Sequence, residues 1–402
     1  MIPPREALGR IIEAVRPLGS EEVPLAACVG RVLAKDLSAS IENPPFDNSS
    51  MDGYAVKARD TAEASRLRPV LLGLSGEIPA GHPSASSLPS GKAARILTGA
   101  PMPRGADAVV MQEQTDLSDG RVKVFSSVDP KENVRSAGED VRKGDPLLPA
   151  GRTLNPLEVA LLASQGVVRV PVARRPRTAI VATGSELVRP AEAPAFGQLR
   201  DSNGPCLAAA VRQAGAEPVD HGIVRDRPDL LTDAFAKALD GADLLLVSGG
   251  VSVGDYDHTR KVLEELGMKT LFWRVAVKPG KPLLFGMRGS TAVFGLPGNP
   301  VSVWVSFEEF VRPAIGKMLG RPAEDRWRFR GKAVNEFRLP PDRQQYLFCR
   351  ASQEGDDVEL RIIRPQGSGM LGMASKANAL AMSPPGARQV GIGEILPFRW
   401  IG

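Results

Sequence analysis

The sequence is poor in cysteine and histidine, with three residues of each among 402. Cys28, Cys206 and Cys349 lie far apart and show no paired spacing, which argues against a disulfide framework and is typical of a reducing compartment. Zinc sites are built mainly from cysteine and histidine, so the same shortage argues against a zinc site. Any metal ion is expected to be a hard cation bound by carboxylate oxygens.

The sequence also lacks long apolar runs and a strong excess of one charge. No segment approaches the ~20 apolar residues of a membrane span, and charges occur throughout the N-terminal segment. Lys and Arg number 51 against 46 Asp and Glu, and the net charge of +5 is spread without a long basic run. We therefore expect a cytoplasmic protein with neither a membrane nor a nucleic acid as partner.

Glycine and proline are abundant instead, with 41 and 35 residues. This composition predicts many turns, and a chain of this length is expected to hold at least two domains of ~100 to 200 residues each. Apolar residues at helical spacing predict an amphipathic helix over residues 5–18, whereas residues 43–140 are typical of a β-rich module. Residues 155–166 carry the N-cap asparagine, first-turn proline and terminal glycine of a helix.

From residue 177 the pattern changes, because short apolar runs alternate with helical segments. This alternation predicts a parallel, doubly wound α/β sheet, which a long helix over residues 300–319 closes. Beyond residue 321, alternating runs between turns predict a C-terminal β domain. The predicted fold class is therefore α/β and multi-domain.

In a doubly wound sheet, ligands bind beyond the carboxyl ends of the strands. Three polar loops are expected at that edge, because each follows a predicted strand. They are residues 183–186, 248–257 and 295–300. Glycine and serine let backbone N–H groups approach an anion closely, although a tight turn also needs glycine. Together the three loops favour a ligand that bears phosphate.

Carboxylates follow the same strands, namely Glu186, Asp226, Asp255 and Asp257. Mg²⁺ accepts one or two such oxygen ligands together with substrate phosphate. For Asp226 or Asp255 taken singly, a role as a helix cap is an equal alternative.

Cations are expected on the next extended segment. Strand alternation would place Arg274 and Lys278 on one face, where both reach the same anion, and Lys281 follows a Pro-Gly turn. A solvated strand face is the alternative reading of this segment.

Two familiar patterns do not lead to a function. Residues 250–254 match the G-x-S-x-G nucleophile elbow, but the one histidine that follows, His258, is too close to complete a hydrolase triad in the usual order. Residues 367–372 match G-x-G-x-x-G, but no βαβ unit follows them, so they do not predict a dinucleotide site. This second loop could still close over a ligand.

Several longer segments resemble one known family, the molybdopterin molybdenumtransferases, which include bacterial MoeA proteins and the E domain of gephyrin. The segments occur in the family's order and comprise residues 45–55, 98–101, 182–187, 248–254, 278–282 and 296–302. The resemblance implies a discontinuous helical linker domain (1–45 plus 141–173), a β-rich inserted domain (46–140), an α/β molybdopterin-binding domain (174–321) and a C-terminal β-barrel (322–402).

The resemblance also implies an activity and an assembly. The reaction would insert molybdenum from molybdate into adenylylated molybdopterin with release of AMP, supported by a divalent cation such as Mg²⁺. The protein would be a homodimer, and each cleft would combine the central domain of one subunit with the N-terminal part of the other. Molybdopterin adenylyltransferase and molybdoenzymes would be its protein partners.

Carried over by position, the resemblance implies roles for individual residues. Catalytic roles fall on Asp52, Thr98, Asp257 and Lys278, and metal binding falls on Glu186, Asp226 and Asp257. Cofactor binding falls on Thr183, Gly184, Ser185, Ser248, Gly249, Gly250, Ser252, Gly254, Arg274, Lys281, Pro297, Gly298, Asn299 and Pro300. At Arg274 the family often has lysine, and a guanidinium holds an anion with a different geometry from an ammonium.

Two other functions remain open at this point. A molybdopterin adenylyltransferase resembles the central domain alone, but residues 43–55 and the added β domains disfavour it. A non-catalytic scaffold that binds peptides, as the gephyrin E domain does, has no marker in this sequence.

Overall fold

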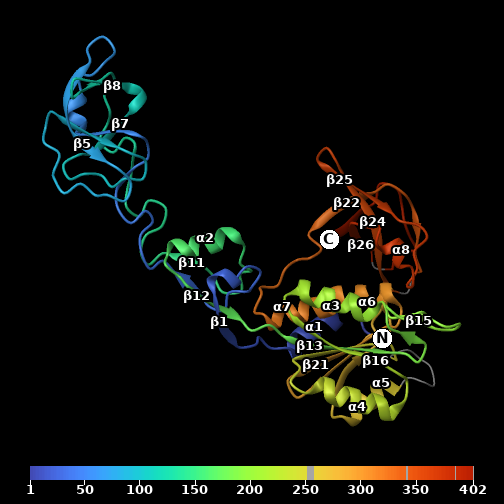
Figure 1. The fold of residues 1–402 in the computed structure, drawn as a ribbon. Helices are drawn as coiled ribbons and strands as arrows, with labels where there is room; N and C mark the ends of the chain where they lie inside the picture. The colour runs from blue at the N-terminus through green and yellow to red at the C-terminus, as the bar shows by residue number, and fades with distance from the viewer. Residues whose placement is uncertain (251–257, 341–342, 385, 402) are drawn as a thin grey trace.

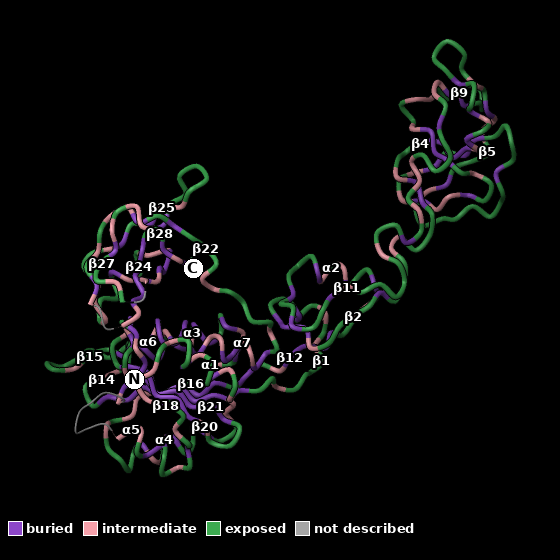
Figure 2. The backbone as a smooth tube through the Cα atoms, turned by 180° about the vertical axis from the view of Figure 1, so that it is seen from behind, coloured by how far each residue is buried: buried purple, intermediate pink, exposed green. Residues whose placement is uncertain are grey.

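A computed structural model describes residues 1–250, 258–340, 343–384 and 386–401. The molecule is elongated (Figure 1): a β-rich domain lies at one end, a linker domain in the middle, and an α/β domain with a β-barrel at the other end. Buried residues form cores within the single parts (Figure 2), and one larger core runs through the α/β domain to barrel residues such as Phe348 and Leu380. The multi-domain α/β architecture expected from the sequence is confirmed. Among the described residues, no helix is long and apolar enough to cross a membrane.

The linker domain is built from two distant stretches of chain. Strand β1 (Ser20–Pro24) pairs antiparallel with β12 (Arg169–Ala173), and β2 (Leu37–Ser38) pairs with β11 (Pro146–Leu148). The predicted helix appears as α2 (Pro156–Ser164), where Asn155 accepts the N–H groups of Leu157 and Glu158. A short 3₁₀ turn covers Leu25–Ala27. The chain leaves and re-enters the linker at one point, because Asn43 N–H donates to Val141 O at 2.8 Å.

The first helix, α1 (Pro4–Ala14), packs on α7 (Arg312–Met318) and on the π-turn (Phe307–Val311) of the α/β domain. Its buried residues Ala7 and Ile11 belong to the same core as Val311 and Ile315. The predicted extent of 5–18 is wrong at its end. Val15 is already extended, and Pro17 disfavours a helical conformation in the residue before it.

The inserted β domain contains a six-stranded sheet with the order β7-β4-β6-β5-β9-β8. Its strands are β4 (Gly53–Val56), β5 (Val70–Ile78), β6 (Lys92–Ile96), β7 (Ala108–Met111), β8 (Thr115–Ser118) and β9 (Arg121–Val124). At its base, β3 (Asn48–Ser49) pairs with β10 (Val134–Arg135). Two 3₁₀ turns cover Ala58–Thr61 and Gln112–Gln114.

The α/β domain contains a six-stranded sheet with the order β16-β13-β17-β21-β20-β18. The first four strands run parallel, as predicted: β16 (Glu217–Val224), β13 (Arg177–Thr183), β17 (Leu244–Ser248) and β21 (Thr291–Leu296). Strand β20 (Leu284–Arg288) is antiparallel to β21 and to β18 (Lys269–Trp273). Short strands β14 (Leu187–Val188) and β15 (Leu199–Arg200) pair outside this sheet.

Helices cover both faces of this sheet (Figure 1). On one face lie α3 (Asn203–Ala214), α6 (Pro300–Ser306) and α7 (Arg312–Met318), and on the other lie α4 (Pro228–Leu239) and α5 (His258–Glu265). A π-turn at Phe307–Val311 joins α6 to α7, so the predicted long helix over 300–319 is present with one widened turn.

The C-terminal domain is a closed barrel of five strands. Around it run β24 (Gln344–Glu354), β25 (Asp357–Ile362), β22 (Phe329–Ala333), β28 (Ile395–Trp400) and β26 (Ala379–Met382), which returns to β24. Strands β23 (Phe337–Arg338) and β27 (Gln389–Val390) pair separately, and α8 (Leu371–Ala374) is a single turn. Strand β19 (Val277–Lys278), which comes from the α/β domain in sequence, pairs with the barrel strand β24.

A buried ion network joins this barrel to the α/β domain. Glu308, in the π-turn, contacts Arg312 at 2.7 Å, Arg326 at 2.7 Å and Arg399 at 2.8 Å. Burial alone would raise the pKa of Glu308, but hydrogen bonding from Arg312 and the charges of the arginines outweigh it and lower the pKa to about 2. The carboxylate is therefore charged at every ordinary pH and holds the two domains together.

We expect Glu308→Gln to destabilise the native protein by about 3 kcal/mol, because it leaves buried arginines without their counter-charge. The stability that Glu308 contributes is present above its ordinary pKa of 4.5 and is lost as pH falls from there towards about 2. Urea unfolding, followed by tryptophan fluorescence, should therefore show a gap between wild type and variant that narrows from pH 5 to pH 2. Glu265→Gln, at an exposed carboxylate 3.9 Å from Lys261, is the control and should change little. An equal gap at every pH would contradict this role of the charge.

Candidate functional site

The three predicted loops meet at one edge of the sheet. Strands β13, β17 and β21 are direct parallel neighbours, and their registers align Ala182 with Ser248 and Ser248 with Leu296. The segments that begin at Thr183, Ser248 and Pro297 therefore leave the sheet side by side. Gly249 N–H donates to Leu296 O at 3.1 Å, which ties the second loop to the third.

Glycine is required at the centre of this edge. Gly249 and Gly250 have φ angles of +99° and +61°, which residues with side chains rarely adopt. A Cβ atom on Gly249 would lie 2.4 Å from Thr183 O, and one on Gly250 would lie 2.2 Å from the hydroxyl of Thr259. The loop after β17 thus packs too closely against Thr183 and Thr259 to admit a side chain at either glycine.

Two predicted carboxylates lie beside the first loop. Asp226 Oδ2 accepts the N–H of Ser185 at 3.0 Å, and the Ser185 hydroxyl lies 3.2 Å from the Asp226 N–H, which donates to it. Asp226 therefore fastens the end of β16 to the end of β13, and the N-cap of α4 is Arg227. Glu186 folds back so that a Cβ on Gly184 would lie 2.8 and 2.9 Å from its two carboxylate oxygens.

Four predicted residues of the second loop lie outside the described residues, namely Ser252, Gly254, Asp255 and Asp257. Within the described ranges, no three His, Cys, Asp or Glu side chains gather in a way that could hold a metal ion. Glu186 and Asp226 thus supply at most part of a metal site, and further oxygens would have to come from residues 251–257 or from a ligand.

The predicted lysines line a cavity between the α/β domain and the barrel. The cavity has a volume of about 260 Å³, and its walls include Lys278, Lys281, Asn299, Ser302 and Ser368. Both lysines are exposed, so their charges are available to an anion. Val301 N–H donates to Ser368 O at 3.0 Å, which brings the glycine-rich loop of residues 367–369 against the third loop of the sheet edge.

Arg274 does not join these lysines. Strand β18 ends at Trp273, and Arg274 has a φ of +71°, so the extended segment that would place Arg274 and Lys278 on one face is interrupted. The Arg274 guanidinium lies 4.0 Å from the centre of the Trp273 ring, a cation–π contact. Within the described part of the chain, Arg274 is not among the residues that line the cavity.

Asp52 and Thr98 meet each other, but far from the sheet edge. Asp52 Oδ1 accepts hydrogen bonds from the N–H and from the hydroxyl of Thr98, both at 2.7 Å. These hydrogen bonds lower the pKa of Asp52 below its usual range. The pair lies in the inserted β domain at the opposite end of the molecule (Figure 1). Within one chain, these two residues and the glycine loops therefore lie in different domains and do not meet.

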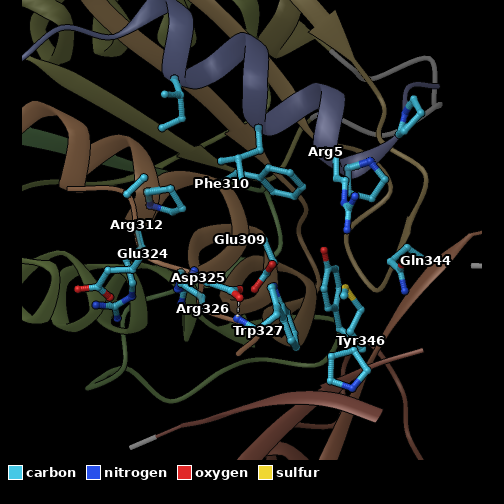
Figure 3. A pocket seen from close by; sticks show the side chains of 18 of the residues that line it. Arg5, Glu309, Phe310, Arg312, Glu324, Asp325, Arg326, Trp327, Gln344 and Tyr346 are labelled. Carbon is cyan, nitrogen blue, oxygen red and sulfur yellow. Dashed lines mark hydrogen bonds between the residues drawn. The ribbon is translucent and has the colours of Figure 1, made fainter. Parts of the chain in front are cut away.

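A larger hollow of about 1490 Å³ lies between α1, α7 and the barrel. Figure 3 shows Glu309, Arg326, Trp327 and Tyr346 along its wall. Of the predicted site residues that the structure describes, none lines it. It borders the ion network of Glu308, so its size reflects the junction of two domains and not the edge at which the loops converge.

Asp201 and Asn203 belong to the sheet edge but were not predicted. Asn203 Nδ2 donates to Ser248 Oγ and to Gly298 O, both at 2.8 Å, and Asp201 caps the first turn of α3. The polar run 201–204 before the predicted helix is an N-cap signal that could have identified the start of α3. The two contacts of the Asn203 side chain are with residues 45 and 95 positions further along the chain, so no local sequence pattern predicts them.

Comparison with known proteins gives consistent matches over the chain. Residues 2–166 match the family model "MoeA N-terminal region (domain I and II)", residues 179–317 match "Probable molybdopterin binding domain", and residues 330–398 match "MoeA C-terminal region (domain IV)". The molybdopterin molybdenumtransferase of Haemophilus influenzae is 36% identical over 95% of both chains, and that of Nostoc sp. is 43% identical over 79% of this chain and 74% of its own. A solved molybdopterin biosynthesis MoeA protein of Pyrococcus horikoshii OT3 superposes with a TM-score of 0.85 at 31% identity, covering 99% of each chain.

We expect Gly249→Ala to lower the free energy of unfolding by at least about 2 kcal/mol, because it combines an unfavourable φ with a backbone collision. Gly298→Ala is the matched control, since its added Cβ would meet only Gly249 Cα at 4.0 Å and its φ is not in the left-handed region. The control should stay within about 0.5 kcal/mol of wild type in the same urea titration. Equal stability of both variants would show that the Gly249 backbone has room to relax.

Proposed function

We propose that this chain, which belongs to the molybdopterin molybdenumtransferase (MoeA) family, transfers molybdenum from molybdate to adenylylated molybdopterin and releases AMP. The observation that carries this proposal is the convergence of three glycine-bearing loops at the ends of β13, β17 and β21, next to a cavity lined by two lysines. Such an arrangement suits a large polyanionic ligand, which needs backbone donors and cations at once. Its place in metabolism is molybdenum cofactor biosynthesis.

The pyrophosphate link of the substrate would lie over the loops that start at Thr183, Ser248 and Pro297. Gly249 and Gly250 shape the second of these loops, because the space that their Cβ atoms would need is filled by Thr183 O and the Thr259 hydroxyl. Preorganised donors aimed at the oxygens stabilise the charge that develops when the link to AMP is cleaved. The chain then needs no covalent nucleophile.

Molybdate, the second substrate, would bind in the cavity of Lys278 and Lys281. The oxyanion and the lysines have opposite charges, and Ser302 and Ser368 also line the cavity. Asn299, another lining residue, follows directly on Pro297 and Gly298. This neighbourhood would place the metal oxyanion beside the pterin nucleotide.

A Mg²⁺ ion fits the acidic side of this edge. Glu186 and Asp226 are hard oxygen donors on adjacent loops, and Asp257 would add a third from residues that the structure does not describe. Together with substrate phosphate, such a donor set is what Mg²⁺ accepts. When bound, the ion would neutralise charge on the pyrophosphate oxygens.

Asp52 and Thr98 would complete the site from a second copy of the chain. Their separation from the glycine loops within one chain supports a homodimer in which each cleft combines two protomers (Figure 1). The N–H and hydroxyl of Thr98 hold Asp52 ionised and oriented at the end of β4. Asp52 then presents a fixed carboxylate to the pterin or to the metal.

We further propose a cytoplasmic location, which suits three free cysteines, and molybdopterin adenylyltransferase and molybdoenzymes as partners that deliver the substrate and receive the product. A second candidate function is molybdopterin adenylyltransferase activity. The α/β domain alone would suit that reaction, but the linker and the inserted domain would then have no role.

Purified protein given adenylylated molybdopterin, molybdate and Mg²⁺ should release AMP and form molybdenum cofactor. Lys278→Ala should lower the rate on the order of 10²-fold and shift the molybdate dependence upward, because it removes a positioned cation. AMP release and cofactor formation, measured over a molybdate titration, test both statements. Product formed from molybdopterin and ATP instead would favour the adenylyltransferase.

A mixture of two inactive variants tests the shared cleft. Asp52→Ala and Lys278→Ala, unfolded together and refolded, form mixed dimers in which one cleft carries both substitutions and the other carries none. If each cleft combines two protomers, random pairing should restore about a quarter of the wild-type AMP release. Each variant refolded alone is the control and should stay inactive. If the refolded mixture forms dimers but recovers no AMP release, Asp52 and Lys278 act in a cleft formed by a single chain.

A further inference from the structure

Asn203 lies at the centre of the sheet edge, although it carries no charge and no predicted role. It is the first residue of α3, and its side chain is largely buried, with 8% of the residue exposed. Its amide Nδ2 donates to Ser248 Oγ and to Gly298 O, both at 2.8 Å. One side chain thus bridges the loop after β17 and the loop after β21.

The orientation of this amide is fixed by chemistry. Gly298 O can only accept a hydrogen bond, so the NH₂ group of Asn203 must face it. Oδ1 of Asn203 is then left buried, and among the described residues it has no hydrogen-bond partner. An unpaired buried oxygen does not favour stability, and such exceptions are typical of functional sites.

The backbone around Asn203 holds the amide in place. Asp201 Oδ1 accepts the N–H groups of Asn203 at 2.9 Å and of Gly204 at 3.0 Å. A Cβ on Gly204 would lie 2.5 Å from Asp201 Oδ2, so the carboxylate packs directly against the helix start. Asp201 N–H in turn donates to Val188 O at 2.8 Å. These hydrogen bonds fix the backbone from which the Asn203 amide extends.

We propose that Asn203 is a positioning residue for the transfer reaction, which sets the separation of the Ser248 and Gly298 loops and thereby the place of the substrate pyrophosphate. This inference rests on the proposed function. Gly249 N–H already ties the second loop to the third through Leu296 O. Asn203 adds a second tie, between Ser248 at the end of β17 and Gly298 in the third loop. Without this second tie, the two loops can move apart slightly. The bound pyrophosphate would then shift out of the position in which it reacts.

Asn203→Leu, which keeps the shape and removes both hydrogen bonds, tests this role. We expect kcat for AMP release to fall on the order of 10²-fold, as for a misplacement of about 1 Å, with a smaller change in KM. Asn203→Asp should behave alike, because a carboxylate cannot donate to Gly298 O. If Asn203→Leu does not fold, Asn203→Asp serves as the test variant in its place.

Asn378→Leu is the matched control. Asn378 also bridges backbone groups, since it donates to Ala351 O at 2.9 Å and accepts from Ala351 N–H at 2.7 Å, but it does so within the barrel. The control should lower Tm without changing kcat. Wild-type kcat in Asn203→Leu and Asn203→Asp, with Tm lowered as in Asn378→Leu, would overturn the proposal and leave a structural role.

A double-mutant cycle examines the route through Ser248. If Asn203 acts by holding this loop, the kcat losses in Ser248→Ala and Asn203→Leu should overlap, and the double variant should be little worse than Asn203→Leu alone. Fully additive losses in kcat would overturn the coupling to Ser248. Wild-type protein that releases no AMP would overturn the proposed function itself, whereas active wild type with unaffected Asn203 variants would overturn only this inference.

Discussion

The close approach of backbone from neighbouring parallel strands is the constraint on which the rest of the site depends. Gly249 and Thr183 come so near that one added carbon would collide with a carbonyl oxygen. The parallel register of β13, β17 and β21 brings all three loops to one level, and hydrogen bonds from Gly249 and Asn203 hold the second and third loops together there. Charged side chains surround these loops. Glu186 and Asp226 lie beside the first loop, and Lys278 and Lys281 line the cavity next to the third.

The cationic side of the site is not a property of the α/β domain alone. Lys278 sits on β19, and β19 takes its only described strand partner from the barrel. The placement of the lysine thus depends on how the barrel docks, and the buried network of Glu308 with Arg326 and Arg399 contributes to that docking together with apolar packing. The proposed oxyanion site is therefore coupled to the stability of a domain interface.

Much of this could be predicted from sequence, for identifiable reasons. Alternating strand and helix patterns predict a doubly wound sheet, and the rule for its carboxyl edge then places residues as distant as Thr183 and Asn299 together. Arg274 was placed wrongly, because alternation assumes an unbroken strand and Arg274 adopts a left-handed conformation. Asn203 was missed, because its two contacts are set by tertiary packing. The pairing of Asp52 with Thr98 follows from the register of Gly53 with Ile96, which no local pattern reveals.

The chain enters and leaves the inserted β domain at one point, where Asn43 is bonded to Val141. A module with adjoining ends adds almost no loop-closure entropy to its host, because the host already holds those two residues together. Replacing the segment between these two residues with a short turn should therefore leave the fold of the linker, the α/β domain and the barrel intact.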